Sequence, residues 1–85
     1  MKEFSFSDSG IIPTTTINTK GLNCPLPLLV TKKKLNGLSS GQILQVDSTD
    51  SDSLNDISKW CRRVGHTYLG ARVGFGYMSF FIKKG

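Results

Sequence analysis

The chain has 85 residues, 38% hydrophobic and 20% charged, a composition that suits one small domain and excludes a disordered tail. No stretch approaches the roughly 18 apolar residues of a membrane span, and the start lacks the apolar core of a signal peptide, so we expect a cytoplasmic protein. Eleven basic and six acidic residues give a net charge of +5, which favours acidic partner surfaces.

Strand and helix patterns alternate along the chain after a polar, serine-rich stretch. We expect residues 1–13 to form a flexible lead-in and residues 14–85 to form a single domain. β-branched runs, hydrophobic spacing and turn residues predict the elements in this order: a strand at 14–18, a helix at 25–38, a strand at 43–47, a helix through 54–64, a strand at 67–73 and a strand through 78–82. The predicted fold class is α/β, a two-layer βαβαββ sandwich with a four-stranded mixed sheet and two helices on one face.

The hydrophobic positions of these elements indicate which side chains form the core. The expected inward residues are Leu28, Leu35 and Leu38 on the first helix, Leu54, Ile57, Cys61 and Val64 on the second, Leu69, Ala71 and Val73 on the third strand, and Met78, Phe80 and Ile82 on the last. Residues Ser51 to Ser53 offer N-caps for the second helix, and Gly65 offers its C-cap.

The pentapeptide Asn23-Cys24-Pro25-Leu26-Pro27 places a thiol where the first helix should begin. With Pro25 at the first helical position, Cys24 would occupy the N-cap, where the helix dipole favours a thiolate. Lys20 and Lys32 would stabilise the thiolate further if they lie close, and Gly21 supplies an unusual backbone angle. From the residues alone, a reactive thiol and a structural cap or small buried residue both remain open.

Other chemistry-bearing residues have simpler interpretations. Cys61 falls on an apolar stripe and is expected in the core, and His66 follows a helix end, where a structural role is the commoner one. Cys24, Cys61 and His66 lack the paired short spacings of a zinc motif, so no metal or other cofactor is expected. N-capping explains the acidic cluster Asp47, Asp50, Asp52 and Asp56 better than a calcium loop does.

A basic run, Lys32, Lys33 and Lys34, follows the thiol on the same helix. It is either a solvated helix face or, with Lys20, a docking surface for an acidic partner protein. Direct nucleic-acid binding is less well supported, because no aromatic residues interleave with the basic ones. Phe75, between two glycines, is either a partner contact or a turn residue folded onto the sheet.

A set of motifs across residues 14–84 resembles the TusA/SirA/YedF family of small sulfur carriers. The matching segments are Gly21-Leu22-x-Cys24-Pro25-x-Pro27, Thr49-Asp50, Asp56-Ile57-x-x-Trp60-Cys61-x-x-x-Gly65-His66 and a closing Phe-x-Ile-x-Lys. The resemblance implies the βαβαββ sandwich and a persulfide on Cys24, within a Cys-Pro-x-Pro motif supported by Pro25, Pro27 and Gly21. Asn18 stands where family members often have an acidic residue, and Leu26 stands where TusA itself has one.

The resulting prediction is a cytoplasmic sulfurtransferase-type carrier, monomeric when free. By resemblance, its partners are a sulfur donor, such as a cysteine desulfurase or a rhodanese-like protein, and an acceptor in tRNA thiolation or another branch of sulfur metabolism. It is an enzyme only in a broad sense, because specificity would come from partner docking. The alternatives are a regulatory module that binds nucleic acid or protein through the basic helix, and a selenium- or redox-handling protein that uses the same thiol.

Overall fold

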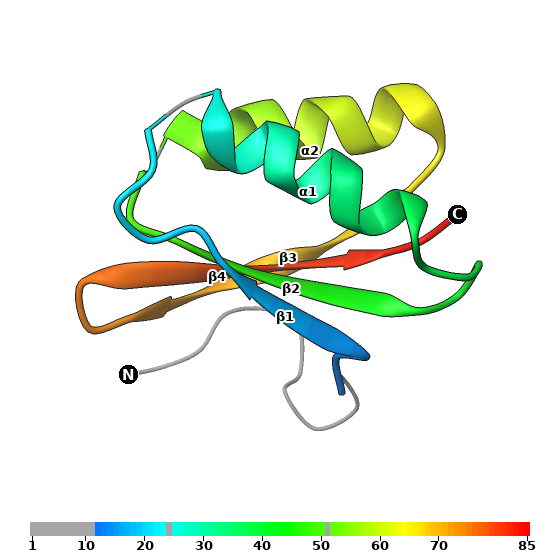
Figure 1. The fold of residues 1–85 in the computed structure, drawn as a ribbon, viewed down its shortest axis with the longest axis horizontal. Coiled ribbons are helices and arrows are strands. Elements are labelled where there is room, and N and C mark those ends of the chain that lie inside the picture. The colour runs from blue at the N-terminus through cyan, green and yellow to red at the C-terminus, as the bar shows by residue number, and fades with distance from the viewer. Residues whose placement is uncertain (1–11, 24, 51) are drawn as a thin grey trace.

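The computed structural model describes residues 12–23, 25–50 and 52–85. Its elements follow the predicted order: β1 (Thr15–Asn18), α1 (Leu26–Asn36), β2 (Ile43–Ser48), α2 (Asp52–Val64), β3 (Thr67–Gly74) and β4 (Tyr77–Lys83). The strands form one mixed sheet in the order β1-β2-β4-β3, and both helices lie on the same face of it (Figure 1). The predicted fold class is therefore confirmed.

Strand direction places three segments at one end of the sheet. β1 runs parallel to β2, with Asn18 opposite Asp47, because α1 forms the crossover between them. β4 runs antiparallel to both β2 and β3, with Ser48 opposite Met78. The ends of β1 and β2 and the β3–β4 turn therefore share one end of the sheet, which we call the hairpin end. α1 also begins on this side of the molecule (Figure 1).

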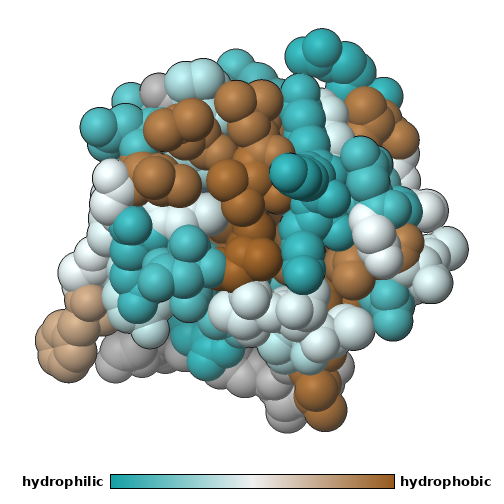
Figure 2. Space-filling view, in the orientation of Figure 1, coloured by the Kyte–Doolittle hydropathy of each residue, from teal (hydrophilic) through white to brown (hydrophobic). Residues whose placement is uncertain are grey.

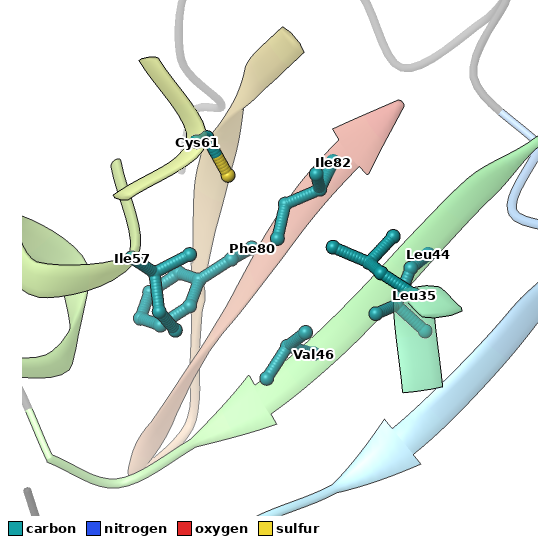
Figure 3. Packing of buried hydrophobic residues seen from close by; sticks show 7 residues of the cluster. All are labelled: Leu35, Leu44, Val46, Ile57, Cys61, Phe80 and Ile82. Atoms are coloured by element: carbon teal, nitrogen blue, oxygen red, sulfur yellow. The ribbon is translucent and has the colours of Figure 1, made fainter. Parts of the chain in front are cut away.

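The core lies between the helices and the sheet (Figure 3). Its fully buried side chains come from both layers: Leu35 of α1, Ile57 and Cys61 of α2, Leu44 and Val46 of β2, and Phe80 and Ile82 of β4. Leu28, Leu38 and Leu54 are partly buried against this cluster. The helical spacing read from the sequence therefore predicted the inward faces, apart from Val64, which is 48% exposed at the end of α2.

The inward face predicted for the third strand is wrong in part. Tyr68 pairs with Ile82 and Gly70 pairs with Phe81, so a β-bulge interrupts the alternation at Leu69. Tyr68 takes the inward position expected of Leu69, and Ala71 packs beside it against the core. Val73 lies in register with Met78 but is 72% exposed.

The helix boundaries also differ from the prediction by a residue or two. α1 begins at Leu26, with Pro25 as its N-cap, and ends at Asn36 rather than Leu38. At the start of α2, Asp50 accepts the Asp52 amide, and Ser53 is buried within the helix. Ser51, another expected cap, lies outside the described residues, as does the predicted lead-in apart from Ile12 and Pro13. Within the described ranges, no helix is long and apolar enough to cross a membrane.

Candidate functional site

The loop from Thr19 to Pro25 joins β1 to α1 and carries the cysteine that the sequence singled out. Cys24 lies outside the described residues, so the site is defined by its neighbours. Asn23 and Pro25 are both exposed to solvent. The Leu26 amide donates to the Asn23 carbonyl at 2.8 Å, and the Leu29 amide donates to the Pro25 carbonyl at 3.1 Å. Asn23 and Pro25 are therefore exposed residues whose carbonyls are hydrogen-bonded to the first turn of α1.

Hydrogen bonds fix the start of this loop to β2 and the segment after it. Thr19 is fully buried, and both its amide and its Oγ1 donate to the Asp47 carbonyl, at 2.7 and 2.6 Å. Gly21 adopts a φ of +88°, a left-handed conformation that suits glycine, and its amide donates to Thr49 Oγ1 at 2.9 Å. The sequence motifs included Thr49 without a role; the structure makes it an anchor of the loop.

The expected capping position of Cys24 is wrong by one residue. Pro25 is the N-cap of α1, with φ −98° and ψ 16°, and Cys24 precedes it in the sequence. The Leu26 amide donates to the Asn23 carbonyl. Pro27 has no amide proton, so Leu28 carries the next amide of the first turn. That turn contains no acidic residue, so the positive end of the helix dipole is not offset there.

The four lysines proposed for partner binding do not form one cluster. The Lys20 ammonium lies 4.1 Å from the centroid of the Tyr77 ring, beside the turn of the β3–β4 hairpin. The Lys32 ammonium lies 5.6 Å from the Trp60 ring on α2. Both lysines that were expected to stabilise the thiolate thus lie over aromatic rings, each on a different element. Lys33 and Lys34 are exposed on the last turn of α1 and stay available for docking.

Cys61 occupies the core, as predicted. Its side chain has no solvent-exposed area and points among the core residues (Figure 3). Burial raises the pKa of the thiol from 9.0 to about 11. A protonated thiol without solvent contact is a poor nucleophile. The second cysteine of the chain is therefore a structural residue.

His66 also has a structural environment. Its ring lies against Trp60, with centroids 5.1 Å apart, and its Nδ1 accepts the Gly85 amide at 3.0 Å. Burial, and then the charge of Lys84, lower the pKa of His66 below 6.5. A neutral imidazole that accepts a backbone amide agrees with the structural role predicted for it.

Two carboxylates of the acidic cluster, those of Asp47 and Asp50, accept hydrogen bonds within the fold. Both carboxylate oxygens of Asp50 accept hydrogen bonds at the start of α2, from the Asp52 amide and the Ser53 hydroxyl. The Asp47 carboxylate accepts hydrogen bonds from the Ser79 hydroxyl at 2.7 Å and from the side-chain amide of Gln45 at 2.9 Å. Among the described residues, no three His, Cys, Asp or Glu side chains gather as a metal site would require.

Comparisons with known proteins place the chain in a family. Residues 15–84 match the family model described as Sulfurtransferase TusA. The sulfur carrier protein TusA of Allochromatium vinosum is 41% identical over 68 residues, which cover 80% of this chain and 90% of that protein. The protein YrkF of Bacillus subtilis is 36% identical over 72 residues; the match covers 85% of this chain but only 39% of YrkF.

A solved structure agrees with these sequence matches. A SirA-like protein from Desulfitobacterium hafniense superposes with a TM-score of 0.69 at 27% identity, covering 84% of this chain and 97% of that one. The fold is thus that of a small two-layer α/β protein, shared with this SirA-like structure. The chain belongs to the TusA family, as its motifs predicted.

Proposed function

We propose that this chain is a sulfur carrier that holds sulfane sulfur on Cys24 as a persulfide. The carrier role is that of the TusA family to which the chain belongs. The observation that supports Cys24 as the carrying residue is the burial of the other cysteine. Cys61 has no exposed area and a pKa near 11, so it is a poor candidate for exchange with a partner. Asn23 and Pro25, the sequence neighbours of Cys24, are exposed at the start of α1.

The proposed chemistry resembles thiol–disulfide exchange. The Cys24 thiolate attacks the terminal sulfur of a donor persulfide; a new S–S bond forms on Cys24, and the sulfur–sulfur bond of the donor breaks. The donor thiolate leaves with the electron pair of that bond. In the second step, a nucleophile of the acceptor attacks the outer sulfur on Cys24, and the Cys24 thiolate leaves. No oxidant or metal is needed, because the sulfane sulfur moves between two sulfur nucleophiles without a net redox change.

The environment at the start of α1 supports this role. The positive end of the helix dipole favours the Cys24 thiolate and the persulfide anion over their protonated forms. Pro25 and Pro27 restrict the backbone on both sides of Leu26. Gly21, held by Thr49, and buried Thr19 anchor the start of the loop to the sheet. We assign these residues to support of the loop, and Lys33 and Lys34 to contact with an acidic partner.

The proposed partners are a cytoplasmic donor, such as a cysteine desulfurase or a rhodanese-like protein, and an acceptor protein of a sulfur relay. Transfer of sulfur from a donor to the chain, which we call loading, tests the proposal directly. The chain is incubated with cysteine and each of a panel of cysteine desulfurases, or with thiosulfate and a rhodanese, and its intact mass is measured. We expect a gain of about 32 Da, one sulfur atom, in the wild type and in Cys61→Ala, but none in Cys24→Ala.

Two results would count against the carrier role: no gain with any donor, or a gain that persists in Cys24→Ala. A binding module predicts a different pattern. It would bind RNA or an acidic protein in a salt-sensitive way, independently of Cys24 and dependent on Lys33 and Lys34.

A further inference from the structure

The β3–β4 hairpin presents an aromatic side chain to solvent at its tip. Phe75 is 99% exposed, and Val73 beside it is 72% exposed. Gly74 and Gly76 flank Phe75, and Gly76 adopts a φ of +77°, which closes the turn. The sequence left open whether this ring folds onto the sheet, and the structure shows that it does not. A fully exposed phenylalanine has no role in the core of this chain.

The tip lies at the end of the molecule from which the Cys24 loop departs. Asn18, the last residue of β1, and the β3–β4 turn both belong to the hairpin end. The Lys20 ammonium lies 4.1 Å from the centroid of the Tyr77 ring, and Tyr77 pairs with Gly74 beside the turn, so the loop contacts the hairpin close to its tip. The start of the loop therefore contacts the hairpin, and the end of the loop leads into α1 (Figure 1).

A second apolar surface begins where the loop enters α1. Leu26, Leu29 and Val30 are 46%, 50% and 37% exposed, and their spacing places them on one outward face of the helix. Figure 2 shows hydrophobic residues gathered over the first half of α1, next to a row of hydrophilic ones. Lys33 continues the same face one turn later, and Lys34 adjoins it. Exposed apolar residues that gather beside charged ones are typical of protein-binding surfaces.

The charge of these two elements indicates the kind of partner. Neither α1 nor the β3–β4 hairpin contains an acidic residue, whereas together they contain Lys32, Lys33, Lys34, Arg72 and Lys83. The acidic residues of the described chain all lie between Asp47 and Asp56, where Asp47 and Asp50 accept hydrogen bonds within the fold. A complementary surface would present carboxylates beside an apolar pocket.

We propose that Phe75, together with Leu26, Leu29 and Val30, forms a two-part apolar docking surface for a sulfur-exchanging protein. This partner holds the Phe75 ring in an apolar pocket and places carboxylates opposite Lys33 and Lys34. The inference rests on the proposed carrier function and adds the residues by which a partner recognises the carrier. An aromatic side chain seated in a pocket is the usual anchor of such an interface. Docking at both elements would bring the partner over the loop between them.

The test compares a protein donor with a small one. Sulfur is delivered to Cys24 by a cysteine desulfurase with cysteine, or by inorganic polysulfide, which needs no docking surface. We expect Phe75→Ser to lower kcat/KM for the desulfurase reaction by about 10-fold or more, mainly through KM, because anchor residues dominate interface energies. The rate of loading from polysulfide should match that of the wild type. Val64→Ser is the matched control, because Val64 is 48% exposed at the opposite end of the sheet.

The outcomes separate this inference from the carrier function. Desulfurase kinetics unchanged in Phe75→Ser would overturn the docking surface, as would an equal loss with polysulfide or with Val64→Ser. A wild type that accepts sulfur from polysulfide but from no protein donor also counts against it. If the wild type accepts sulfur from neither source, the carrier function itself fails. If the wild type binds anionic phospholipid vesicles and Phe75→Ser does not, the surface is assigned to a membrane instead. If the wild type self-associates and Phe75→Ser does not, the surface is assigned to a second copy of the chain.

Discussion

The burial of Cys61 leads to a sharp prediction about which thiol of the native protein reacts. With a pKa of about 11, roughly one Cys61 thiol in a thousand is ionised at about pH 8. Because the side chain has no exposed area, even that fraction meets a reagent only when the protein opens. An exposed thiol of pKa 9.0 is about one-tenth ionised at that pH, so we expect Cys61 to react at least about 100-fold more slowly than such a thiol.

A titration with a chromogenic disulfide reagent measures this difference. The native wild type should release one equivalent of chromophore quickly, and a second only after guanidinium chloride unfolds the chain. Native Cys24→Ala should release none quickly, and Cys61→Ala should behave as the wild type does in its fast phase. One fast equivalent from native Cys24→Ala would refute the assignment of Cys61 to the core and reopen its role in sulfur transfer.

The same burial predicts how stability depends on alkaline pH. Burial raises the pKa of Cys61 from 9.0 to about 11 and that of Tyr68 from 10.0 to about 12, the nearby Cys61 adding to the effect on Tyr68. Both groups are neutral when protonated, so the unfolded chain loses their protons first. The contribution of these two groups to the free energy of unfolding should be constant below about pH 9 and fall as the pH rises toward 12. Urea titrations of the wild type and of Cys61→Ala at a series of pH values across this range provide the test. The free energy of unfolding should fall less steeply with pH in Cys61→Ala, and an equal fall in both proteins would contradict the prediction.

Three further predictions concern the loop and the helix ends. Gly21→Ala should destabilise the protein by about 1–2 kcal/mol, because an alanine is strained at φ +88° even though no atom lies within 4 Å of the added Cβ. Gly37→Ala is the control: at φ −91° it should be neutral or stabilising by about 0.5 kcal/mol. Equal urea midpoints for the two variants would contradict this prediction. Thr49→Val should lower the free energy of unfolding by about 1 kcal/mol and Thr49→Ser much less, which chemical denaturation resolves. The fluorescence of Trp60 should change with a midpoint below pH 6.5, as His66 gains a proton, and His66→Gln should abolish the transition.

The fold could be predicted because local patterns and topology agree. Helical spacing identified Leu35 and Ile57, and strand alternation identified Phe80 and Ile82. The right-handed crossover and the glycine-rich turn then left few ways to arrange four strands. The error on β3 has a specific cause: one extra residue at Leu69 reverses the alternation, and a bulge leaves no clear signal in a short strand.

The sequence predicted the reactive residue types of the site but not the long-range contacts that surround them. The glycine and prolines around Cys24 marked a constrained loop before a helix, but two prolines separated by one residue leave the helix start ambiguous by a residue. The contacts of Lys20 with Tyr77 and of Gly21 with Thr49 join residues far apart in the chain, and no local pattern reports such pairs. The exposure of Phe75 likewise depended on how the turn closes.

The central claim is that sulfur resides on Cys24, and peptide mapping after loading tests it most directly. Trypsin separates the two cysteines into the peptides Gly21–Lys32 and Trp60–Arg62. After loading by a desulfurase and trapping with an alkylating agent, we expect the extra sulfur, about 32 Da, in the peptide that contains Cys24. Extra sulfur in the peptide that contains Cys61, or in neither peptide, would contradict the account.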